Sequence, residues 1–131
     1  MTINFKNAFD IHPAALRVRE KRAELLASNL ANVDTPHYKA RDIDFRAILK
    51  GEQTRHLDLS TTQTSHQLHR VTDPLTGETL YRNPYQASLD GNTVESEQEH
   101  LQFAENALRY QATLGFLSGE IATLRSAIRG D

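Results

Sequence analysis

The sequence predicts a mainly α-helical protein whose two long terminal helices pack as a coiled-coil-like hairpin or bundle around an irregular, partly extended central connector. Two observations predict this fold class: apolar residues recur at helical spacing near both ends, and a polar stretch rich in turn signals lies between them. We therefore divide the 131 residues into an N-terminal helix (1–33), an extended segment with a flexible connector (34–91) and a C-terminal helix (92–131), both termini forming one structural domain.

The first helix is predicted over residues 12–32. Pro13 suits the first helical turn, where its missing N–H forfeits no hydrogen bond, and no glycine or further proline follows before residue 33. Apolar side chains recur along it with spacings of three, four or seven, interrupted by Arg19: Leu16, Ala23, Leu26, Leu30 and Val33. So narrow a stripe favours a seam between helices over the broad face of a globular core.

The second helix, predicted over residues 94–129, carries the clearest pattern in the chain. Eight apolar residues follow one another at alternating spacings of four and three, which is the period of a coiled-coil seam. They are Phe103, Ala107, Tyr110, Leu114, Leu117, Ile121, Leu124 and Ile128. A second stripe lies beside this seam, so the helix should contact more than one neighbour. Its members are Leu101, Ala104, Leu108 and Ala112.

The ends of the second helix are marked by capping signals. Asn92 with Glu95 and Ser96 with Glu99 have the spacing of a capping box, and Gly130 suits a carboxyl-terminal cap. A helix of this length would be a rod of roughly 50 Å, at about 1.5 Å per residue. Because a domain of this size does not normally enclose such a rod, we expect other chains to cover much of it.

The segment between the helices is polar and contains turn signals such as Asp73-Pro74 and Asp90-Gly91. Short strands are predicted at residues 57–60 and 79–81, and residues 38–45 alternate as an extended segment lying on another surface would. The connector has too few apolar groups to offset the entropy lost when it becomes ordered. We therefore expect it to order only in an assembly.

Composition excludes several classes of protein. Fifteen basic and 17 acidic side chains give a formal net charge of −2, so the chain lacks the positive field expected of a nucleic-acid-binding protein. No apolar run approaches the roughly 18 residues that a membrane span requires, and we expect no cleavable signal peptide. The absence of cysteine excludes disulfides and thiolate metal sites.

Candidate catalytic and metal-binding groups have weak support. His66 and His69 lie in the polar connector with too few ligands nearby, so we interpret them as solvated loop residues and not as zinc ligands. Glu95, Glu97 and Glu99 are interpreted as exposed acids favoured by the helix dipole, not as general acids or bases. No phosphate-binding loop or nucleophile motif is present. The sequence therefore predicts a protein that is not an enzyme, with no cofactor, metal or small-molecule substrate.

A basic cluster lies on the first helix, and two interpretations of it remain open. It is either a solvated helical face or a set of partners for acids on a neighbouring chain, such as residues 95–99, that fixes the register of packed helices. The cluster consists of Arg17, Arg19, Lys21 and Arg22.

The end of the first helix and the residues after it carry a motif, Ala31-Asn32-Val33-Asp34-Thr35-Pro36 followed by Tyr38-Lys39. The motif resembles the amino-terminal signature of the axial proteins of the bacterial flagellum, the rod and hook family. The resemblance extends to residues 40–45 and to residues 90–130, and it is weak through the connector. Where the family usually has glycine this chain has His37, which is tolerated less well if the turn requires a positive φ. The signature residues are Ala31, Asn32, Thr35, Pro36, Tyr38 and Lys39.

The resemblance implies a structural subunit of the proximal rod of the flagellar basal body, assembling with copies of itself and other axial proteins to transmit torque across the periplasm. It also implies export through the type III apparatus without a cleaved signal peptide, and contact with the membrane-ring junction protein at the rod base. In this family the terminal helices pack into an inner tube of coiled coils, which implies that the two apolar stripes form the assembly seam. No nucleic acid is expected among the partners.

Two other functions fit parts of the sequence. A soluble helical-hairpin adaptor or regulator that binds a partner helix would be a stable monomer or dimer, with the connector as its binding loop. A small metal-dependent enzyme built on the connector histidines would hold stoichiometric zinc. The association state and helix content of the purified protein distinguish the adaptor from the rod subunit.

Overall fold

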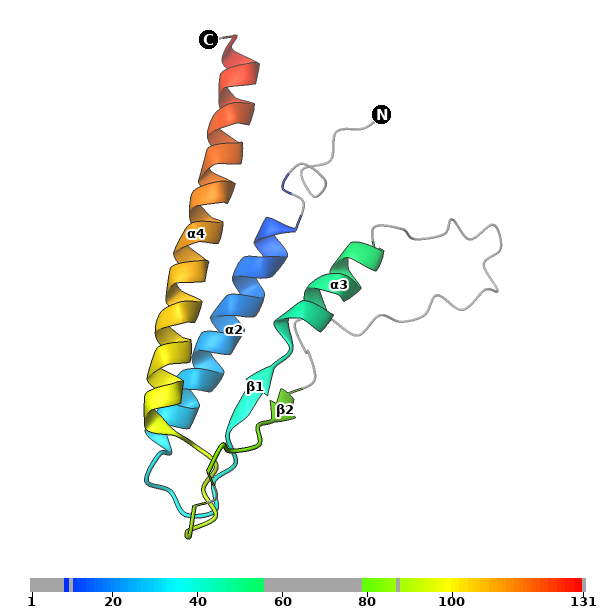
Figure 1. Ribbon diagram of the computed structural model, residues 1–131. Helices are drawn as coiled ribbons and strands as arrows, with labels where there is room; N and C mark the ends of the chain where they lie inside the picture. Colours follow the sequence, from blue (N-terminus) through cyan, green and yellow to red (C-terminus); the bar gives the residue numbers. More distant parts are fainter. Residues whose placement is uncertain (1–8, 10, 56–78, 87, 131) are drawn as a thin grey trace, which may run out of the picture.

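The computed structural model describes residues 9, 11–55, 79–86 and 88–130, and these residues are mainly helical (Figure 1). Its helices and strands are, in chain order, α2 (His12–Ala31), β1 (Arg41–Ile43), α3 (Phe45–Arg55), β2 (Thr79–Tyr81) and α4 (Ser96–Arg129). The mainly α fold class with long helices toward both ends is confirmed.

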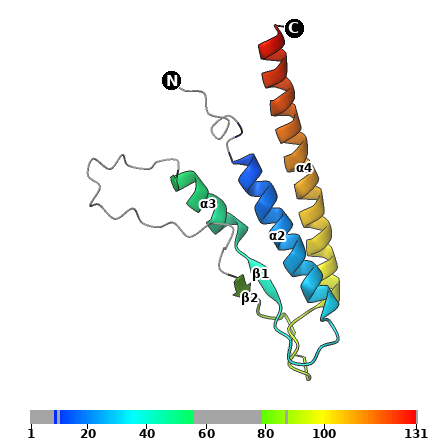
Figure 2. The same ribbon diagram turned by 180° about the vertical axis from the view of Figure 1, so that it is seen from behind.

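α2 is the element against which the others pack. α2 and α4 lie side by side and run antiparallel, so the end of α2 is next to the start of α4 (Figures 1 and 2). β1 and α3 also contact α2, and both views show them on the side of α2 away from α4.

The ends of the two long helices are determined by residues close to them in the sequence. Pro13 occupies the first turn of α2, as predicted. Gly130 ends α4 in the left-handed conformation with φ 78°, and its N–H donates to the Ser126 carbonyl over 2.9 Å. The predicted bounds, 12–32 and 94–129, lie within two residues of those in the structure, which is the usual uncertainty of a helix end.

The two capping boxes predicted at the start of α4 are wrong. Glu95 is the N-cap residue, and no side chain caps the helix. Asn92 is buried instead, and its amide donates to the carbonyls of Asn32 and Val33 over 3.2 and 2.6 Å. Glu99 is also buried, in contact with α2. Both polar groups therefore serve contacts between segments distant in the chain and not the start of the helix.

β1 and β2 form a two-stranded antiparallel sheet in which Asp42 lies opposite Leu80. β2 confirms the strand predicted at residues 79–81, and β1 falls within the segment predicted to be extended. The strand predicted at residues 57–60 lies outside the described residues.

α3 is a helix that the sequence pattern did not predict. Asp44 precedes it, and its carboxylate accepts hydrogen bonds from the N–H groups of Arg46 and Ala47 over 2.9 and 3.0 Å. This is the geometry of an N-cap residue. The N-cap residue Asp44 was the sequence signal for this helix. It was overlooked because the alternation of residues 38–45 indicated an extended chain.

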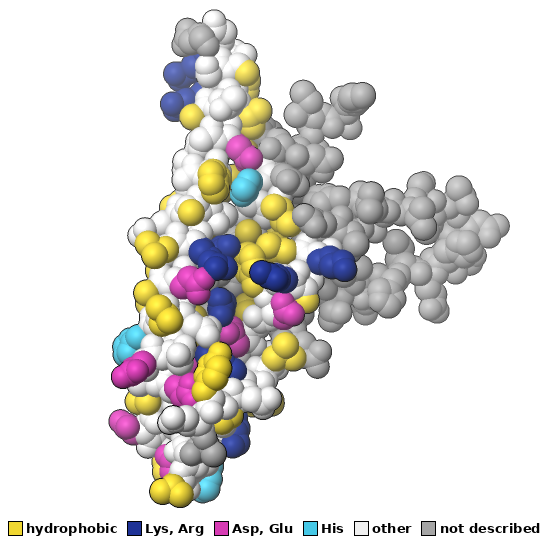
Figure 3. All heavy atoms as spheres, in the orientation of Figure 1, with side chains coloured by type: hydrophobic (Ala, Val, Ile, Leu, Met, Phe, Trp, Pro, Cys, Tyr) yellow, Lys and Arg dark blue, Asp and Glu magenta, His cyan; other side chains and the backbone are white. Residues whose placement is uncertain are grey.

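The apolar core is small. Its buried side chains belong to α2, to β1 and to the residue before β1: Ala15, Val18, Leu26, Ala40 and Ile43. Among the described residues, exposed large apolar side chains outnumber these buried ones, and most of them lie on α4 (Figure 3). None of the described helices combines the length and apolar character needed to cross a membrane. The chain alone therefore leaves much apolar surface on α4 uncovered.

Candidate functional site

The face that α4 turns toward α2 is polar. Glu99, Asn106 and Thr113 are spaced seven residues apart and are 1%, 2% and 8% exposed. The Asn106 amide donates to the carbonyl of Arg19 on α2 over 2.9 Å, and the Thr113 hydroxyl donates to the carbonyl of Arg109 within α4 over 2.8 Å. Because a spacing of seven keeps side chains on one face of a helix, the three residues share one buried polar face of α4, and Glu99 and Asn106 bond to α2 from it.

The same series continues to the far end of the helix pair. The imidazole of His12, at the start of α2, lies 3.3 Å from the carboxylate of Glu120. The His12 ring also lies 6.2 Å from the ring of Phe116. Beyond Glu120, α4 continues for about 2.5 further turns, at about 3.6 residues per turn, past the start of α2.

The predicted seam of α4 lies beside this polar face and is largely open to solvent (Figure 3). Seven of its eight residues are exposed, and Leu117 is half-buried. The most exposed is Ile128, at 85%. The exposed members are Phe103, Ala107, Tyr110, Leu114, Ile121, Leu124 and Ile128. A coiled-coil pattern exposed to this extent is available to another chain.

The second stripe of α4 is exposed as well. Leu101 and Leu108 are 62% and 68% exposed, and Ala104 and Ala112 are also exposed. α4 therefore presents two apolar stripes in addition to the polar face that contacts α2.

The stripe predicted on the first helix lies at the edge of the buried face of α2. Only Leu26 of its members is buried, and the others are half-buried: Leu16, Ala23, Leu30 and Val33. The residues that α2 buries are Ala15, Val18, Leu26 and Asn29. Because successive residues are about 100° apart around a helix, a shift of one position moves a side chain from the centre of a contact to its edge.

A buried polar cluster, Asn29, Arg41, Arg82 and Glu99, joins α2, α4, β1 and the residue after β2. The Asn29 side chain is 0% exposed; its Nδ2 donates to the Arg41 carbonyl over 2.8 Å, and its Oδ1 accepts from the Arg41 N–H over 3.1 Å. The amide of Asn29 therefore pairs with the backbone of β1 as a neighbouring strand would. The Glu99 carboxylate accepts from Asn29 Nδ2 over 3.2 Å and lies 2.6 Å from the guanidinium of Arg82.

A second ion pair connects α2 with β1. The Arg22 guanidinium donates to both carboxylate oxygens of Asp42 over 2.9 Å, and its Nη2 also donates to Gln102 of α4 over 2.6 Å. The two parallel hydrogen bonds have the planar fork geometry that favours arginine over lysine. The hydrogen bond to Asp42 raises the pKa of Arg22 above its usual value, although burial acts in the opposite direction.

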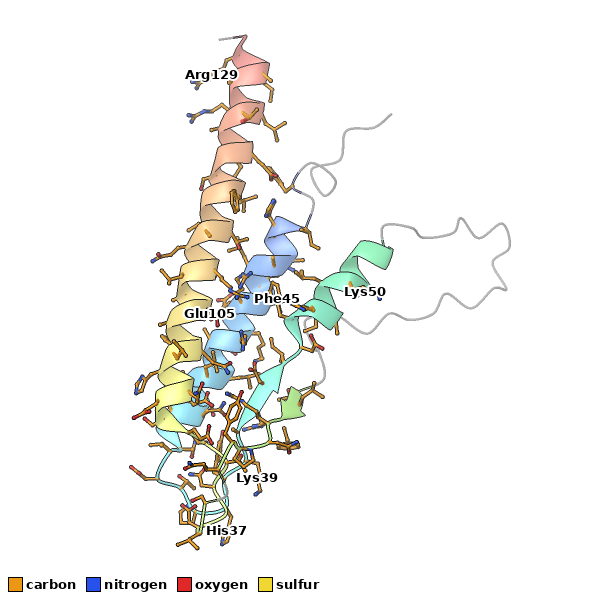
Figure 4. The ribbon with its side chains drawn as sticks, in the orientation of Figure 1. His37, Lys39, Phe45, Lys50, Glu105 and Arg129 are labelled. Carbon is orange, nitrogen blue, oxygen red and sulfur yellow. The ribbon has the colours of Figure 1, made fainter. Side chains whose placement is uncertain are left out.

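Arg19, the polar interruption of the predicted stripe, packs on an aromatic ring. Its guanidinium lies 4.3 Å from the ring centroid of Phe45 at the start of α3, in a cation–π contact (Figure 4 labels Phe45). Burial lowers the pKa of Arg19, and the positive charges of Arg109 and Arg22 lower it further. Neither interpretation of the basic cluster holds for Arg19 or Arg22, because both find their partners within their own chain.

The three acids at the start of α4 have different environments. Glu97 is exposed, as predicted. The Glu95 carboxylate accepts hydrogen bonds from the N–H groups of Tyr85 and Gln86 over 2.9 and 3.0 Å. The interpretation of Glu99 as an exposed acid is wrong, because its side chain is enclosed between α4 and α2 by the buried polar cluster.

Several signature residues tie the chain into a turn after α2. The Asn32 amide donates to the carbonyl of Ser28 over 2.8 Å, and Thr35 N–H donates to the carbonyl of Asn32 over 3.1 Å. The Tyr38 hydroxyl lies 3.2 Å from the Ser28 hydroxyl, within hydrogen-bond distance. These contacts hold the turn against the end of α2, just before β1 begins.

One further signature residue, Lys39, bonds to the segment that leads into α4. The Lys39 ammonium donates to the carbonyl of Gly91 over 2.8 Å (Figure 4 labels Lys39). Ala31 and Pro36 are exposed. Pro36 lies in the turn that follows α2.

His37 has the backbone conformation for which glycine is best suited. Its φ is 62°, the only positive value among the described non-glycine residues. The His37 N–H donates to the Asp90 carbonyl over 3.0 Å, which holds the turn against the opposite segment. A Cβ on Gly91, whose φ is 72°, would lie 2.9 Å from His37 Nδ1, so a side chain at residue 91 would displace the imidazole ring. The turn after Pro36 therefore has, at His37, the positive φ that glycine adopts more easily than histidine.

His37→Gly is expected to raise the free energy of unfolding by about 0.5 to 1 kcal/mol, because glycine adopts a positive φ without the steric cost borne by histidine. Urea denaturation of the two proteins measures the difference. Asp34→Gly is the matched control, since Asp34 is exposed in the same turn without a positive φ, and it should lower stability. A His37→Gly protein that is no more stable than the parent would contradict the strain at this residue.

Within the part of the chain that the structure describes, no group of three or more histidine, aspartate or glutamate side chains could hold a metal ion. His66 and His69, the candidates for such a site, lie outside the described residues.

Comparison with known proteins identifies the family. No family model matches the chain. The flagellar basal body rod protein FlgB of Aeromonas hydrophila is 45% identical over 133 residues, covering 100% of this chain and 99% of that protein. FlgB of Cereibacter sphaeroides is 46% identical over 97% of this chain and 98% of its own length, and FlgB of Escherichia coli K12 is 46% identical over 88% of each. The chain therefore belongs to the family of the flagellar basal body rod protein FlgB, a structural protein of the rod and not an enzyme, as the sequence predicted.

Proposed function

We propose that this chain contributes to the rod wall by packing the apolar seam of α4 against helices of neighbouring subunits. The neighbours are copies of itself and other rod proteins. The observation that carries the proposal is the separation of two faces on α4: a polar face contacts α2, and the coiled-coil seam beside it is exposed. A seam with seven of its eight residues exposed to solvent is costly for an isolated protein and favourable for one that assembles.

In this proposal the coiled-coil-like packing of the terminal helices is completed between subunits. The stripe of the first helix shares the same neighbour through its four half-buried members, Leu16, Ala23, Leu30 and Val33, whereas its fifth member, Leu26, is buried within the chain. The second stripe of α4 then contacts a further helix, so that each α4 is surrounded on several sides. The terminal segments 1–33 and 92–131 act as one structural domain, and residues 34–91 connect them.

The same proposal covers assembly and position in the cell. The subunit is exported through the type III apparatus without a cleaved signal peptide, assembles at the junction with the membrane ring and transmits torque across the periplasm. The small core supports export of an unfolded chain, because a protein with few buried apolar side chains unfolds at a low free-energy cost. Many small contacts between subunits then carry the mechanical load.

The helix content of the purified chain is expected to rise as the chain associates. At low concentration the subunit should be a monomer with partial helix content, and it should gain helix as it associates, because neighbours cover the exposed face of α4. Circular dichroism and sedimentation velocity over a wide concentration range measure the two quantities together.

The opposite result has a defined meaning. A monomer that is fully helical at every dilution and melts in one sharp transition would favour the helical-hairpin adaptor and contradict the proposed rod subunit.

A further inference from the structure

The segment that follows α2 and the segment that leads into α4 are joined by hydrogen bonds. The Thr93 N–H donates to the carbonyl of Tyr38 over 3.0 Å, and the Thr93 hydroxyl accepts from the Ala40 N–H over 2.7 Å. The bonds described above add three further donors to this contact: His37, Lys39 and Asn92. Together they connect residues that are 52 to 60 positions apart in the chain. We refer to the two joined segments, residues 32–40 and 90–93, as the clasp.

The clasp lies at the end of the molecule where α2 ends and α4 begins (Figures 1 and 2). Part of it is buried, since Ala40 is 0% and Asn92 is 5% exposed. A buried N–H group without a partner is costly, so the Ala40 N–H depends on the hydroxyl of Thr93. The clasp is therefore a specific contact that the loss of one partner weakens.

Elsewhere α4 is held to the rest of the molecule by scattered polar contacts. Among the described residues, the buried apolar side chains belong to α2, to β1 or to the residue before β1, and none belongs to α4. The contacts of α4 with α2 are hydrogen bonds or ion pairs spread along the helix, such as those of Gln102, Asn106 and Glu120. Contacts of this kind contribute little individually. The position of α4 beside α2 therefore depends on the clasp.

We propose that the clasp holds α2 and α4 as a preformed pair in the free subunit, so that the stripe of α2 and the seam of α4 meet a neighbour together. Asn92 and Thr93 are its positioning residues, and neither belongs to the seam or to the signature. The inference rests on the proposed rod function and adds to it the residues that prepare the subunit for assembly.

A preformed pair favours assembly for an entropic reason. Bringing together the two ends of the long connector costs conformational entropy, and the clasp bears that cost within one chain, before any neighbour binds. A surface that is already arranged associates more tightly than one that must become ordered during binding. The loss of the clasp should therefore weaken association even though every residue of the seam is intact.

A distance measurement between spin labels tests whether the clasp positions the helices. The chain has no cysteine, so Arg17→Cys on α2 and Gln111→Cys on α4 allow two labels at exposed residues. In the dilute parent protein, pulsed electron paramagnetic resonance should give one narrow distance distribution. Asn92→Ala with Thr93→Val removes the bonds that these two side chains make in the clasp, and it should broaden the distribution at least twofold.

Thr113→Val is the matched control for this double variant. It makes the same substitution at a buried threonine of α4 whose hydroxyl bonds within the helix and not to the clasp, so the distribution should stay narrow. Lys39→Met, at an exposed residue, removes only the bond to the Gly91 carbonyl and should broaden the distribution to a smaller extent. This milder variant decides the question if the double variant loses its helices in circular dichroism.

Association of the same proteins tests what the clasp contributes to assembly. In sedimentation velocity the double variant should need at least a tenfold higher concentration than the parent to associate. A covalent tie at the other end of the helix pair separates positioning from other effects: His12→Cys and Glu120→Cys, whose parent side chains lie 3.3 Å apart, can be joined by a short bismaleimide. The tie should restore association of the double variant to within about threefold of the tied parent, because it pairs α2 with α4 without the clasp.

The outcomes distinguish the clasp from the proposed function. Three results overturn the clasp: a narrow distance distribution in the double variant, association of that variant at the concentration of the parent, or a tied double variant that does not associate. A broadened distribution together with association that the tie restores supports it. If the parent itself associates at no concentration, the proposed rod contact is overturned, and the distance distributions alone decide whether the clasp holds the helices.

Discussion

Leu114→Asp is expected to abolish assembly of the subunit and swimming of cells that depend on it. Leu114 belongs to the seam and is 46% exposed in the isolated chain, so the substitution removes little from the fold of the monomer. In an assembly the new carboxylate would be enclosed between apolar helices, at a cost of several kcal/mol for each contact. Sedimentation velocity measures the loss of association, and a soft-agar assay measures the loss of motility.

The control for this prediction lies one turn away. Gln111→Asp introduces the same charge on α4 at an exposed residue outside the seam, and it should preserve assembly and motility. The thermal melting of both variants should resemble that of the parent monomer. Leu117→Asp should also abolish assembly, but Leu117 is half-buried, so that variant combines two effects. A motile Leu114→Asp strain would remove the seam from the proposal.

The long helices could be predicted because their signals are local. Apolar periodicity along both helices, a proline at the first turn of α2 and a glycine at the end of α4 define these helices to within two residues. α3 was not predicted, because its one strong signal, the N-cap Asp44, follows a segment with the alternation of a strand. The capping boxes failed for a different reason: Asn92 and Glu99 have partners far away in the sequence, and spacing along the chain contains no information about them.

The apolar stripe of the candidate site can be predicted from the sequence, but its orientation relative to α2 cannot. The period of the seam identified which residues of α4 form an apolar stripe, and the family relationship assigns the chain to a rod. Which stripe faces α2 depends on contacts across the molecule. The buried face proved to be the polar series of Glu99, Asn106 and Thr113, which sequence reasoning overlooked although its spacing of seven was visible beside the seam.

A polar contact between α2 and α4 suits a subunit that must find most of its stability in an assembly. Hydrogen bonds such as that from Asn106 to the Arg19 carbonyl fix orientation, but each contributes only about 1 kcal/mol net, because water satisfies the same groups in the unfolded chain. Apolar burial would contribute more per side chain. In the proposed assembly, apolar stripes that only neighbours cover would make the free chain easy to unfold and the assembled one stable.

Glu99→Ala is expected to lower the free energy of unfolding by about 3 kcal/mol, a large fraction of the roughly 5–15 kcal/mol typical of a domain. The substitution leaves the guanidinium of Arg82, which is 20% exposed, without its carboxylate partner 2.6 Å away. It also removes one of the two acceptors of the Asn29 amide nitrogen, whose side chain pairs with the backbone of β1. Urea denaturation followed by circular dichroism measures the loss, and hydrogen exchange at residues 79–82 should increase.

Two further variants determine whether the ion pair or the volume of the side chain is responsible. Glu97→Ala, two residues away and exposed, should change stability by less than about 0.5 kcal/mol. Glu99→Met with Arg82→Met removes both charges and keeps the volume, so it should recover most of what Glu99→Ala loses, because no unpaired charge remains buried. If the double variant were as unstable as Glu99→Ala, the cost would lie in the lost hydrogen bond between Glu99 and Asn29 and not in the unpaired charge of Arg82.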